Sequence, residues 1–305
     1  MRIGIDLGGT KIEVAVLGDA DQIVLRERVA TPRHDYDAIC DAIAGLVLNA
    51  ENVLGARGTV GVAIPGAASP ATGLVKNANT VCLIGNPLEG DLARRLARSV
   101  RLENDANCFV VSEAADGAAA GASSAFGVII GTGCGGGLHL HGRPIGGANS
   151  IAGEWGHNPA PWPRSRANAR PCYCGRSDCI ETYLSGPGLT YTYNEMGPAQ
   201  RANVQAIAAA AAQGEEQARR AFDTHLDQLA CALGTIINVF DPEVVVLGGG
   251  LSNLPGIASE VTRRLPPYVF GPEFESRVVV AKHGDSSGVR GAAWLWSKAE
   301  ASAFK

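Results

Sequence analysis

Hydrophobic residues along the chain fall into short continuous runs that alternate with segments of helical spacing. Apolar runs at 2–6, 12–17 and 22–30 predict three successive strands, and the run at 59–64 predicts a fourth. The segment 36–51 places apolar side chains at helical spacing, at Tyr36, Ile39, Cys40, Ile43, Leu46 and Val47. This alternation of strands and helices predicts an α/β fold.

The rest of the chain repeats this order of elements. Strands are expected at 100–103, 125–130, 243–247 and 277–281, and helices near 88–98, 104–120, 204–240 (interrupted at Gly214) and 287–297. A strand, a glycine-rich turn and a second strand (Glu13–Leu17) begin the chain, and the same order occurs again from residue 125, with the second strand expected at Leu138–His141. We therefore predict two α/β lobes with a cleft between them, formed by residues 1–117 with 287–305 and by residues 118–286.

Two glycine-rich turns are the first candidates for a binding site. One covers Gly4, Ile5, Asp6, Leu7, Gly8, Gly9, Thr10 and Lys11, and the other covers Gly131, Thr132, Gly133, Cys134, Gly135, Gly136 and Gly137. Glycine allows a tight turn and a close approach to a ligand, and the exposed amides of such turns bind anions. Asp6 can orient a hydrated metal ion. Together these features predict a nucleoside triphosphate between the lobes and therefore phosphoryl transfer.

A third glycine cluster follows a predicted strand, at Gly248, Gly249 and Gly250. Glycine here either allows a flat ligand to approach or forms a plain turn between a strand and a helix. Together with the two phosphate turns, we assign this cluster to the adenosine end of ATP.

Four potential metal ligands lie close together in the sequence: His157, Cys172, Cys174 and Cys179. A Cys₃His set is a known closed tetrahedral zinc site, and because all four positions are filled by protein, the zinc is expected to be structural. Three unrelated buried thiols or a local disulfide are the alternatives.

Two carboxylates flank this cluster, Glu154 three residues before His157 and Glu181 two residues after Cys179. A zinc ion here would hold both near one another, where they could accept hydrogen bonds from vicinal sugar hydroxyls. Each glutamate taken alone reads equally as a solvated surface residue.

Asp105 lies where a predicted strand meets a predicted helix, and either Asn104 or Asp105 can be the helix cap. A kinase that phosphorylates an alcohol needs a carboxylate within reach of the hydroxyl, so Asp105 is the candidate general base. Asn79 and Asn104 offer donors and acceptors that suit a polyol, although asparagine near 77–79 also suits a turn.

Composition limits the classes of protein. The chain has 305 residues, 46% of them hydrophobic and 18% charged, with a formal net charge of −4, which is typical of a soluble globular protein and gives no basic patch for nucleic acid. We see no membrane span and no secretory signal. Most of the eight cysteines are scattered through apolar segments, which indicates reduced thiols and a cytoplasmic protein.

These motifs resemble the ROK family (repressors, open reading frames and sugar kinases). The resemblance spans essentially the whole chain and includes Asp6–Lys11, Asn104–Asn107, Gly131–Gly137, Glu154–His157, and the cysteine cluster with Glu181. Within the family the chain looks most similar to bacterial fructokinases of mannokinase-like type, through Lys76–Asn79, Gly156–Pro159 and Lys282–Ala293. The implied fold is the two-lobed, ribonuclease H-like fold of sugar kinases, actin and heat-shock ATPases, with an interlobe cleft.

The resemblance implies Asp105 as the base, with Asn79, Asn104, Glu154, His157 and Glu181 around the sugar. It implies zinc at the Cys₃His set and ATP at the three glycine clusters. Asp178 departs from the family's cysteine motif, which usually has glycine there, and this puts the geometry of that turn in question. The first strand starts at Arg2, so we do not expect the helix-turn-helix of the repressor branch. Family members are often dimers, and a homodimer is possible here.

We therefore expect an ATP-dependent hexose kinase with Mg²⁺ and structural Zn²⁺ as cofactors, acting on the 6-hydroxyl of D-fructose. A kinase of glucose, mannose or an N-acetylhexosamine is the alternative within the same class. A non-catalytic sugar-sensing regulator is the alternative from another class.

Overall fold

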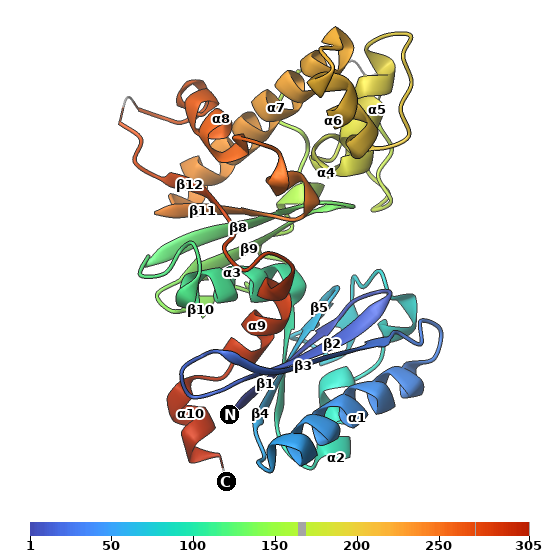
Figure 1. The fold of residues 1–305 in the computed structure, drawn as a ribbon, viewed down its shortest axis with the longest axis vertical. Coiled ribbons are helices and arrows are strands. Elements are labelled where there is room, and N and C mark those ends of the chain that lie inside the picture. Colours follow the sequence, from blue (N-terminus) through green and yellow to red (C-terminus); the bar gives the residue numbers. More distant parts are fainter. Residues whose placement is uncertain (164–168, 272, 305) are drawn as a thin grey trace. The chain divides into compact units, whose positions relative to one another are not determined.

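A computed structural model describes residues 1–163, 169–271 and 273–304 (Figure 1). The chain forms two compact units. The first contains Met1–Gly121, Gly137–Ala152 and His283–Lys305, and the second contains Ala122–Gly136 and Gly153–Lys282. The expected boundaries near 117 and 286 lie close to two of these, but the segment 137–152, which we had placed in the second lobe, groups with the first unit.

The first unit is built on a five-stranded sheet of order β3-β2-β1-β4-β7. The strands are β1 (Arg2–Leu7), β2 (Lys11–Leu17), β3 (Ile23–Ala30), β4 (Thr59–Ile64) and β7 (Val100–Asn104). β2 is antiparallel to β1 and to β3, whereas β4 is parallel to β1 and to β7. A short hairpin, β5 (Ala67–Ala68) and β6 (Val75–Lys76), follows β4.

Each face of this sheet is covered by helices. α1 (Tyr36–Leu54) and α2 (Leu88–Leu96) bury the face that carries the main apolar core, including Ile3, Ile5 and Val62. α9 (Ser287–Trp294) packs on the opposite face, together with α3 (Asp105–Asp116) (Figure 1). A side chain at Gly4 would lie 2.0 Å from the Val289 carbonyl oxygen, so glycine is what lets α9 approach β1.

The second five-stranded sheet has the order β10-β9-β8-β11-β12. Its strands are β8 (Ser124–Ile130), β9 (Cys134–Leu140), β10 (Arg143–Pro144), β11 (Val244–Gly248) and β12 (Arg277–Val280). β11 is parallel to β8 and to β12. The two sheets therefore share one plan, a glycine-turn hairpin followed by two parallel strands, and the predicted duplication of elements is confirmed.

The helices of the second unit follow its hairpin. They are α4 (Glu181–Leu184), α5 (Gly186–Glu195), α6 (Val204–Ala212), α7 (Glu216–Phe240) and α8 (Ile257–Arg264), with short 3₁₀ turns η2 (Trp155–His157), η4 (Gly250–Asn253) and η5 (Pro266–Tyr268). The expected break near Gly214 separates α6 from α7, where Gly214 has φ +90°. The first unit adds η1 (Val81–Leu83), η6 (Gly284–Ser286) and α10 (Lys298–Ala303).

Two details of the predicted elements are wrong. The closing helix expected at 287–297 is two helices, because Ser297 caps α10 through a capping box with Glu300. The second strand of the second hairpin begins at Cys134 rather than Leu138, so Cys134, Gly135, Gly136 and Gly137 lie in a strand. Among the described residues, no helix is both long and apolar enough to cross a membrane.

Candidate active site

The first glycine turn, Gly8–Thr10, joins β1 to β2. The Gly8 amide donates to the Lys11 carbonyl at 3.0 Å, and the Thr31 hydroxyl donates to the Gly8 carbonyl at 2.7 Å. Gly9 and Thr10 are exposed, so their amides are accessible to a ligand. Gly4, Ile5 and Leu7 are buried within β1, and their residue types are explained by packing of the core rather than by a ligand.

Asp6 lies at the penultimate position of β1, on the face that α9 covers. Its carboxylate is half-buried, and a side chain at Gly288 of α9 would lie 3.0 Å from Asp6 Oδ2. Burial, reinforced by the charge of Glu13 and opposed by Lys11 and Arg28, raises the pKa of Asp6 to about 6. A divalent cation nearby favours the ionised carboxylate, so Asp6 fits a role in orienting hydrated Mg²⁺.

Asn79 lines a cavity of about 570 Å³ beside this turn, together with Gly9, Thr10, Arg33, His34 and Thr80–Cys82. The structure thus brings the predicted polyol ligand Asn79 next to the first glycine turn. Arg33 and His34, both exposed, were missed by sequence reasoning. They directly follow Thr31 and Pro32, just after β3. The sequence signal for them is a pair of basic residues in a loop beside a glycine turn.

Asp105 begins α3, but it is not the helix cap. Asn104 is, because its side-chain oxygen accepts from the amides of Ala106 (2.9 Å) and Asn107 (3.4 Å). The Asn104 amide nitrogen donates to the Gly66 carbonyl at 3.1 Å, which ties α3 to the loop after β4. Asp105 is exposed at the N-terminus of the helix, and its Oδ1 also accepts from the Ala106 amide at 2.8 Å.

The metal cluster forms in the second unit as predicted. The ligand atoms of His157, Cys172, Cys174 and Cys179 all lie within 4.8 Å of one another, and the Cys172 Sγ–His157 Nδ1 and Cys174 Sγ–Cys179 Sγ distances are both 3.6 Å. A tetrahedral zinc ion with bonds of about 2.3 Å separates its sulfur ligands by roughly 3.8 Å, so the four residues fit this metal. Hydrogen bonding from the Arg176 backbone lowers the pKa of Cys174 to about 6 and favours the thiolate that zinc binds.

Asp178 is compatible with the turn of the cluster. It adopts φ +57°, the left-handed region where glycine is common and aspartate is tolerated. Its carboxylate accepts hydrogen bonds from the Arg170 amide (2.9 Å) and the Tyr183 hydroxyl (2.6 Å), and these bonds hold the conformation. The departure from glycine therefore leaves the four ligands together.

His157 presents its two ring nitrogens to different partners. Nδ1 faces Cys172, and Nε2 lies 2.9 Å from the hydroxyl of Tyr173, which sequence reasoning missed. Most of the Tyr173 side chain is exposed. The pKa of its hydroxyl is nevertheless raised to about 12, mainly by desolvation and in addition by the negative charges of Glu181 and Glu154. Both glutamates therefore lie near the edge of the cluster, where Glu154 is exposed and Glu181 is half-buried.

The second glycine turn, Gly131–Gly133, joins β8 to β9. The Gly131 amide donates to the Gly133 carbonyl at 3.0 Å, and Glu181 Oε2 accepts from the Cys134 amide at 2.9 Å. The glycines that follow serve packing, since a side chain at Gly136 would lie 2.7 Å from the Trp155 ring and one at Gly137 would lie 2.3 Å from the Ala106 carbonyl oxygen. The ligand-facing part of this motif is therefore the turn itself.

The third glycine cluster lies beside the second turn. A side chain at Gly131 would be 3.7 Å from the Gly250 amide. Gly249 has φ +81°, and a side chain there would lie 2.4 Å from the Ile130 carbonyl oxygen, so only glycine fits. Gly248 is buried as the last residue of β11. The structure thus brings two of the three predicted nucleotide segments together.

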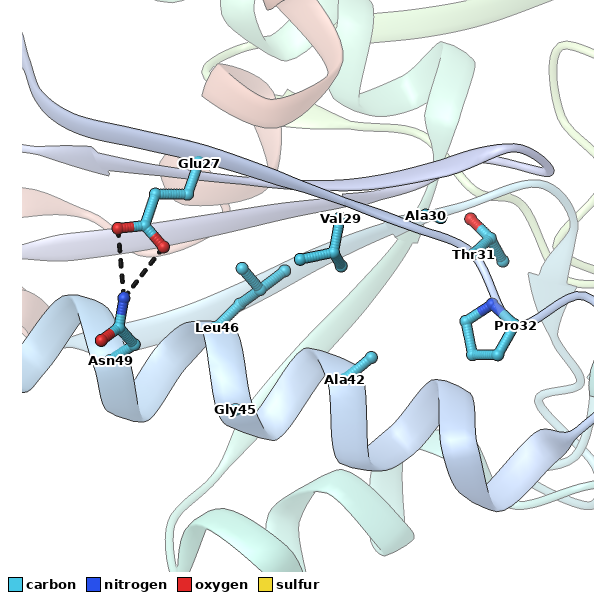
Figure 2. Close-up of a pocket in the computed structure, with 9 residues that line it drawn as sticks. All are labelled: Glu27, Val29, Ala30, Thr31, Pro32, Ala42, Gly45, Leu46 and Asn49. Atoms are coloured by element: carbon cyan, nitrogen blue, oxygen red, sulfur yellow. Dashed lines mark hydrogen bonds between the residues drawn. The ribbon is translucent and has the colours of Figure 1, made fainter.

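A further groove of about 550 Å³ lies between β3 and α1 (Figure 2). The walls of this groove are mainly apolar, from residues such as Val29, Pro32 and Leu46. Glu27 also lines it, and the two oxygens of the Glu27 carboxylate accept from Asn49 Nδ2 at 3.1 and 2.9 Å. The predicted site residues do not line this groove.

A family model described as "ROK family" matches residues 2–299. The chain belongs to the ROK family. It is 43% identical over 300 residues to the N-acetyl-D-glucosamine kinase of Escherichia coli O127:H6, covering 97% of this chain and 99% of that protein. Among solved structures, it resembles the ROK hexokinase of Thermus thermophilus (TM-score 0.83, 30% identity, 96% of each chain). It also resembles a ROK glucokinase of Streptomyces griseus solved with glucose and AMPPNP (TM-score 0.76, 26% identity, 96% and 98% covered).

These ROK relatives confirm the predicted family and two-lobed α/β fold. They do not support the resemblance to fructokinases within the family, because the E. coli relative is named for an N-acetylated hexosamine. Single motifs such as Lys76–Asn79 are too short to identify the acceptor sugar.

Proposed function

We propose that this ROK protein is an ATP-dependent kinase whose acceptor is N-acetyl-D-glucosamine. The observation that carries the proposal is the 43% identity to an N-acetyl-D-glucosamine kinase along nearly the full length of both chains. It favours the N-acetylhexosamine alternative over fructose, which was the main expectation from the sequence.

In the proposed reaction, Asp105 accepts the proton of the acceptor hydroxyl, a primary alcohol at C6, as the oxygen attacks the γ-phosphate. The bond between the γ-phosphorus and the β,γ-bridging oxygen breaks, and ADP leaves with that oxygen. The position of Asp105 supports this role, because it is an exposed residue at the start of α3 and its Oδ1 is oriented by the Ala106 amide at 2.8 Å. The bond from Asn104 to the Gly66 carbonyl fixes that helix end, so the base is held in position before the substrate arrives.

Sugar binding is assigned to polar side chains that each unit contributes. Asn79 and Asn104 donate and accept hydrogen bonds from hydroxyls, and Glu154 and Glu181 accept them. His157 could add a contact only through its Nε2 edge, because Nδ1 faces the metal cluster. Zn²⁺, when bound, cross-links the four ligand side chains and leaves no open position for water.

The nucleotide is assigned to the glycine turns. Exposed amides at Gly9–Thr10 and at Thr132–Gly133 suit phosphate oxygens, and Gly249–Gly250 beside the second turn suits the adenosine. When bound with the nucleotide, Mg²⁺ supplies positive charge against the phosphoryl oxygens. Asp6 orients the water around that ion, and these preorganised groups stabilise the charge that develops during transfer.

An ADP-release assay over a panel of sugars tests the proposal. We expect kcat/KM to be highest for N-acetyl-D-glucosamine, lower for N-acetylmannosamine, glucose and mannose, and lowest for fructose. A preference for fructose would restore the original expectation and reject the proposed acceptor. Sugar binding without ADP release from any sugar would instead identify a non-catalytic sensor.

A further inference from the structure

The segment that follows the metal cluster bonds both ends of the second glycine turn. Glu181, two residues after Cys179, accepts the Cys134 amide at 2.9 Å. At the other end of α4, the Gly186 amide donates to the Gly131 carbonyl at 2.7 Å. Residues 181–186 therefore hold the turn at Gly131, its first residue, and at Cys134, the residue after its last.

A second support comes from the segment that precedes the cluster. Trp155 Nε1 donates to the Gly135 carbonyl at 2.9 Å, and its ring meets Phe126 of β8 edge to face with centroids 5.6 Å apart. Gly156 lies so close to β9 that a side chain there would be 1.9 Å from the Cys134 carbonyl oxygen. The next residue is the metal ligand His157.

The metal cluster is where these two supports meet. The Ile180 amide donates to the Asn158 carbonyl at 2.9 Å, and Pro159 pairs with Cys179 in an isolated β-bridge. His157 and Cys179 are both ligands, so a bound ion joins the support before the cluster to the support after it.

The hydrogen bonds leave a specific set of donors on the turn. The amides of Gly131 and Cys134 are engaged by Gly133 and Glu181. Across the described ranges, the amides of Thr132 and Gly133 have no hydrogen-bond partner, and Thr132 is exposed. These two donors are the ones a phosphate can use.

We propose that the Cys₃His cluster and Glu181 form a clamp that sets the geometry of the second glycine turn for nucleotide binding. Glu181 is then a positioning residue for the phosphates, in addition to its assigned contact with the sugar. The proposal rests on the proposed function, in that the turn must bind nucleotide. The clamp matters because donors that are already oriented need no reorganisation when the phosphate binds.

Variants at Glu181 test the clamp with the metal ligands intact. We expect Glu181→Ala to raise the Kd for Mg·ADP, measured by calorimetry without sugar, about tenfold, as for the loss of a charge-assisted hydrogen bond. Glu181→Gln should raise it less, because the amide oxygen can still accept from Cys134. Zinc content should equal that of the wild type in both variants.

Glu154→Ala is the matched control, because Glu154 also lies near the cluster but makes no hydrogen bond to the turn in the described structure. It should weaken sugar binding and leave the Kd for Mg·ADP within about twofold, a change below 0.5 kcal/mol. If Glu181→Ala binds Mg·ADP as tightly as Glu154→Ala does, the clamp proposal is wrong.

Removal of the metal tests the rest of the clamp. Cys174→Ser, or chelation of the wild type, should raise the Kd for Mg·ADP and speed hydrogen exchange of the Cys134 amide. Cys231→Ser, at a free thiol outside the cluster, should change neither. A folded, zinc-free protein with unchanged nucleotide affinity and unchanged exchange at Cys134 would overturn the proposal. If the wild type binds no nucleotide, the proposed function fails, and exchange at Cys134 still shows whether the clamp exists.

Discussion

The two glycine-turn hairpins share a backbone plan but differ in what they offer a ligand and in how they are held. In the first hairpin the penultimate residue of the leading strand is Asp6, and in the second it is Ile129. The carboxylate at the first turn therefore comes from the hairpin itself, whereas the carboxylate at the second turn, Glu181, comes from α4 and is already bonded to the Cys134 amide. The same backbone plan thus carries an acidic side chain of its own in one hairpin and an apolar one in the other.

The supports of the two turns also differ. The first turn is held by Thr31, from the loop after β3, whose hydroxyl donates a hydrogen bond to the Gly8 carbonyl. The second turn is held by Glu181, Gly186 and Trp155, which flank the metal cluster. We conclude that the first turn is bonded by a residue that follows a strand of its own sheet, while the second is bonded by a segment that carries the four candidate metal ligands.

The largest expected effect comes from Asp105→Asn in the first unit. Turnover should fall about 10²–10⁴-fold, because the acceptor hydroxyl loses its base. The free energy of unfolding should fall by less than about 1 kcal/mol, since the cap Asn104 is kept and an amide oxygen at position 105 can still accept from Ala106. Steady-state kinetics with N-acetyl-D-glucosamine and urea unfolding measure the two quantities. Retention of near wild-type kcat would reject Asp105 as the base.

Asp6→Asn tests the chemical difference between the hairpins. We expect kcat/KM to fall about 10²-fold and the Mg²⁺ concentration for half-maximal rate to rise, because the first turn loses the charge that orients the ion. Rates measured over a Mg²⁺ titration show both effects. As a counterpart, Ile129→Val at the equivalent position of the second hairpin should leave the Mg²⁺ dependence unchanged.

Acid should weaken the packing behind the second turn. Burial lowers the pKa of His225 in α7 to about 4, and a hydrogen bond to the backbone of Tyr183 in α4 offsets part of this shift. Between pH 6.5 and 4, His225 is protonated in the unfolded chain but stays neutral in the folded protein. The free energy of unfolding therefore falls as the pH is lowered, and it levels off below pH 4. At about 1.4 kcal/mol per pKa unit, this group accounts for about 3 kcal/mol.

Urea unfolding from pH 7 to 4, for the wild type and for His225→Gln, measures this contribution. The variant should show a shallower dependence on pH. Equal slopes for the two proteins would show that His225 is not kept neutral in the folded state.

The smallest expected effect is that of Thr31→Val, which removes the side-chain bond to the first turn. The free energy of unfolding should fall by about 1 kcal/mol, as for a single neutral hydrogen bond. The Kd for Mg·ADP should change less than it does in Glu181→Ala. A larger change in Thr31→Val would mean that the first turn, not the second, depends more on its support.

Much of the fold could be predicted from the sequence because its signals are local. The apolar runs gave the strands, the glycines marked the hairpins, and the spacing of Cys172, Cys174 and Cys179 indicated the metal cluster. Asp105 is a candidate base because it lies between a predicted strand and a predicted helix, and that role stays a prediction.

The remainder depends on contacts between residues far apart in the chain. The bond between Cys134 and Glu181 spans 47 residues, and no local pattern predicts it. Likewise, Gly136 and Gly137 read as turn residues, but their role is to let Trp155 and Ala106 pack closely. The proposed acceptor appears in the sequence analysis only as the alternative to fructose, since a single acetamido group is recognised by pocket shape rather than by a motif.

The close approach of α9 to β1 has a consequence for how the protein is made. Gly4 is synthesised near the start of the chain, but the helix that covers it ends at Trp294. At about 5–20 residues per second, the ribosome needs roughly 15–60 s to make the residues between them. During that interval the part of this face that packs against α9, on β1 and β4, is uncovered, so a nascent chain that stalls before α9 presents that part to chaperones and proteases.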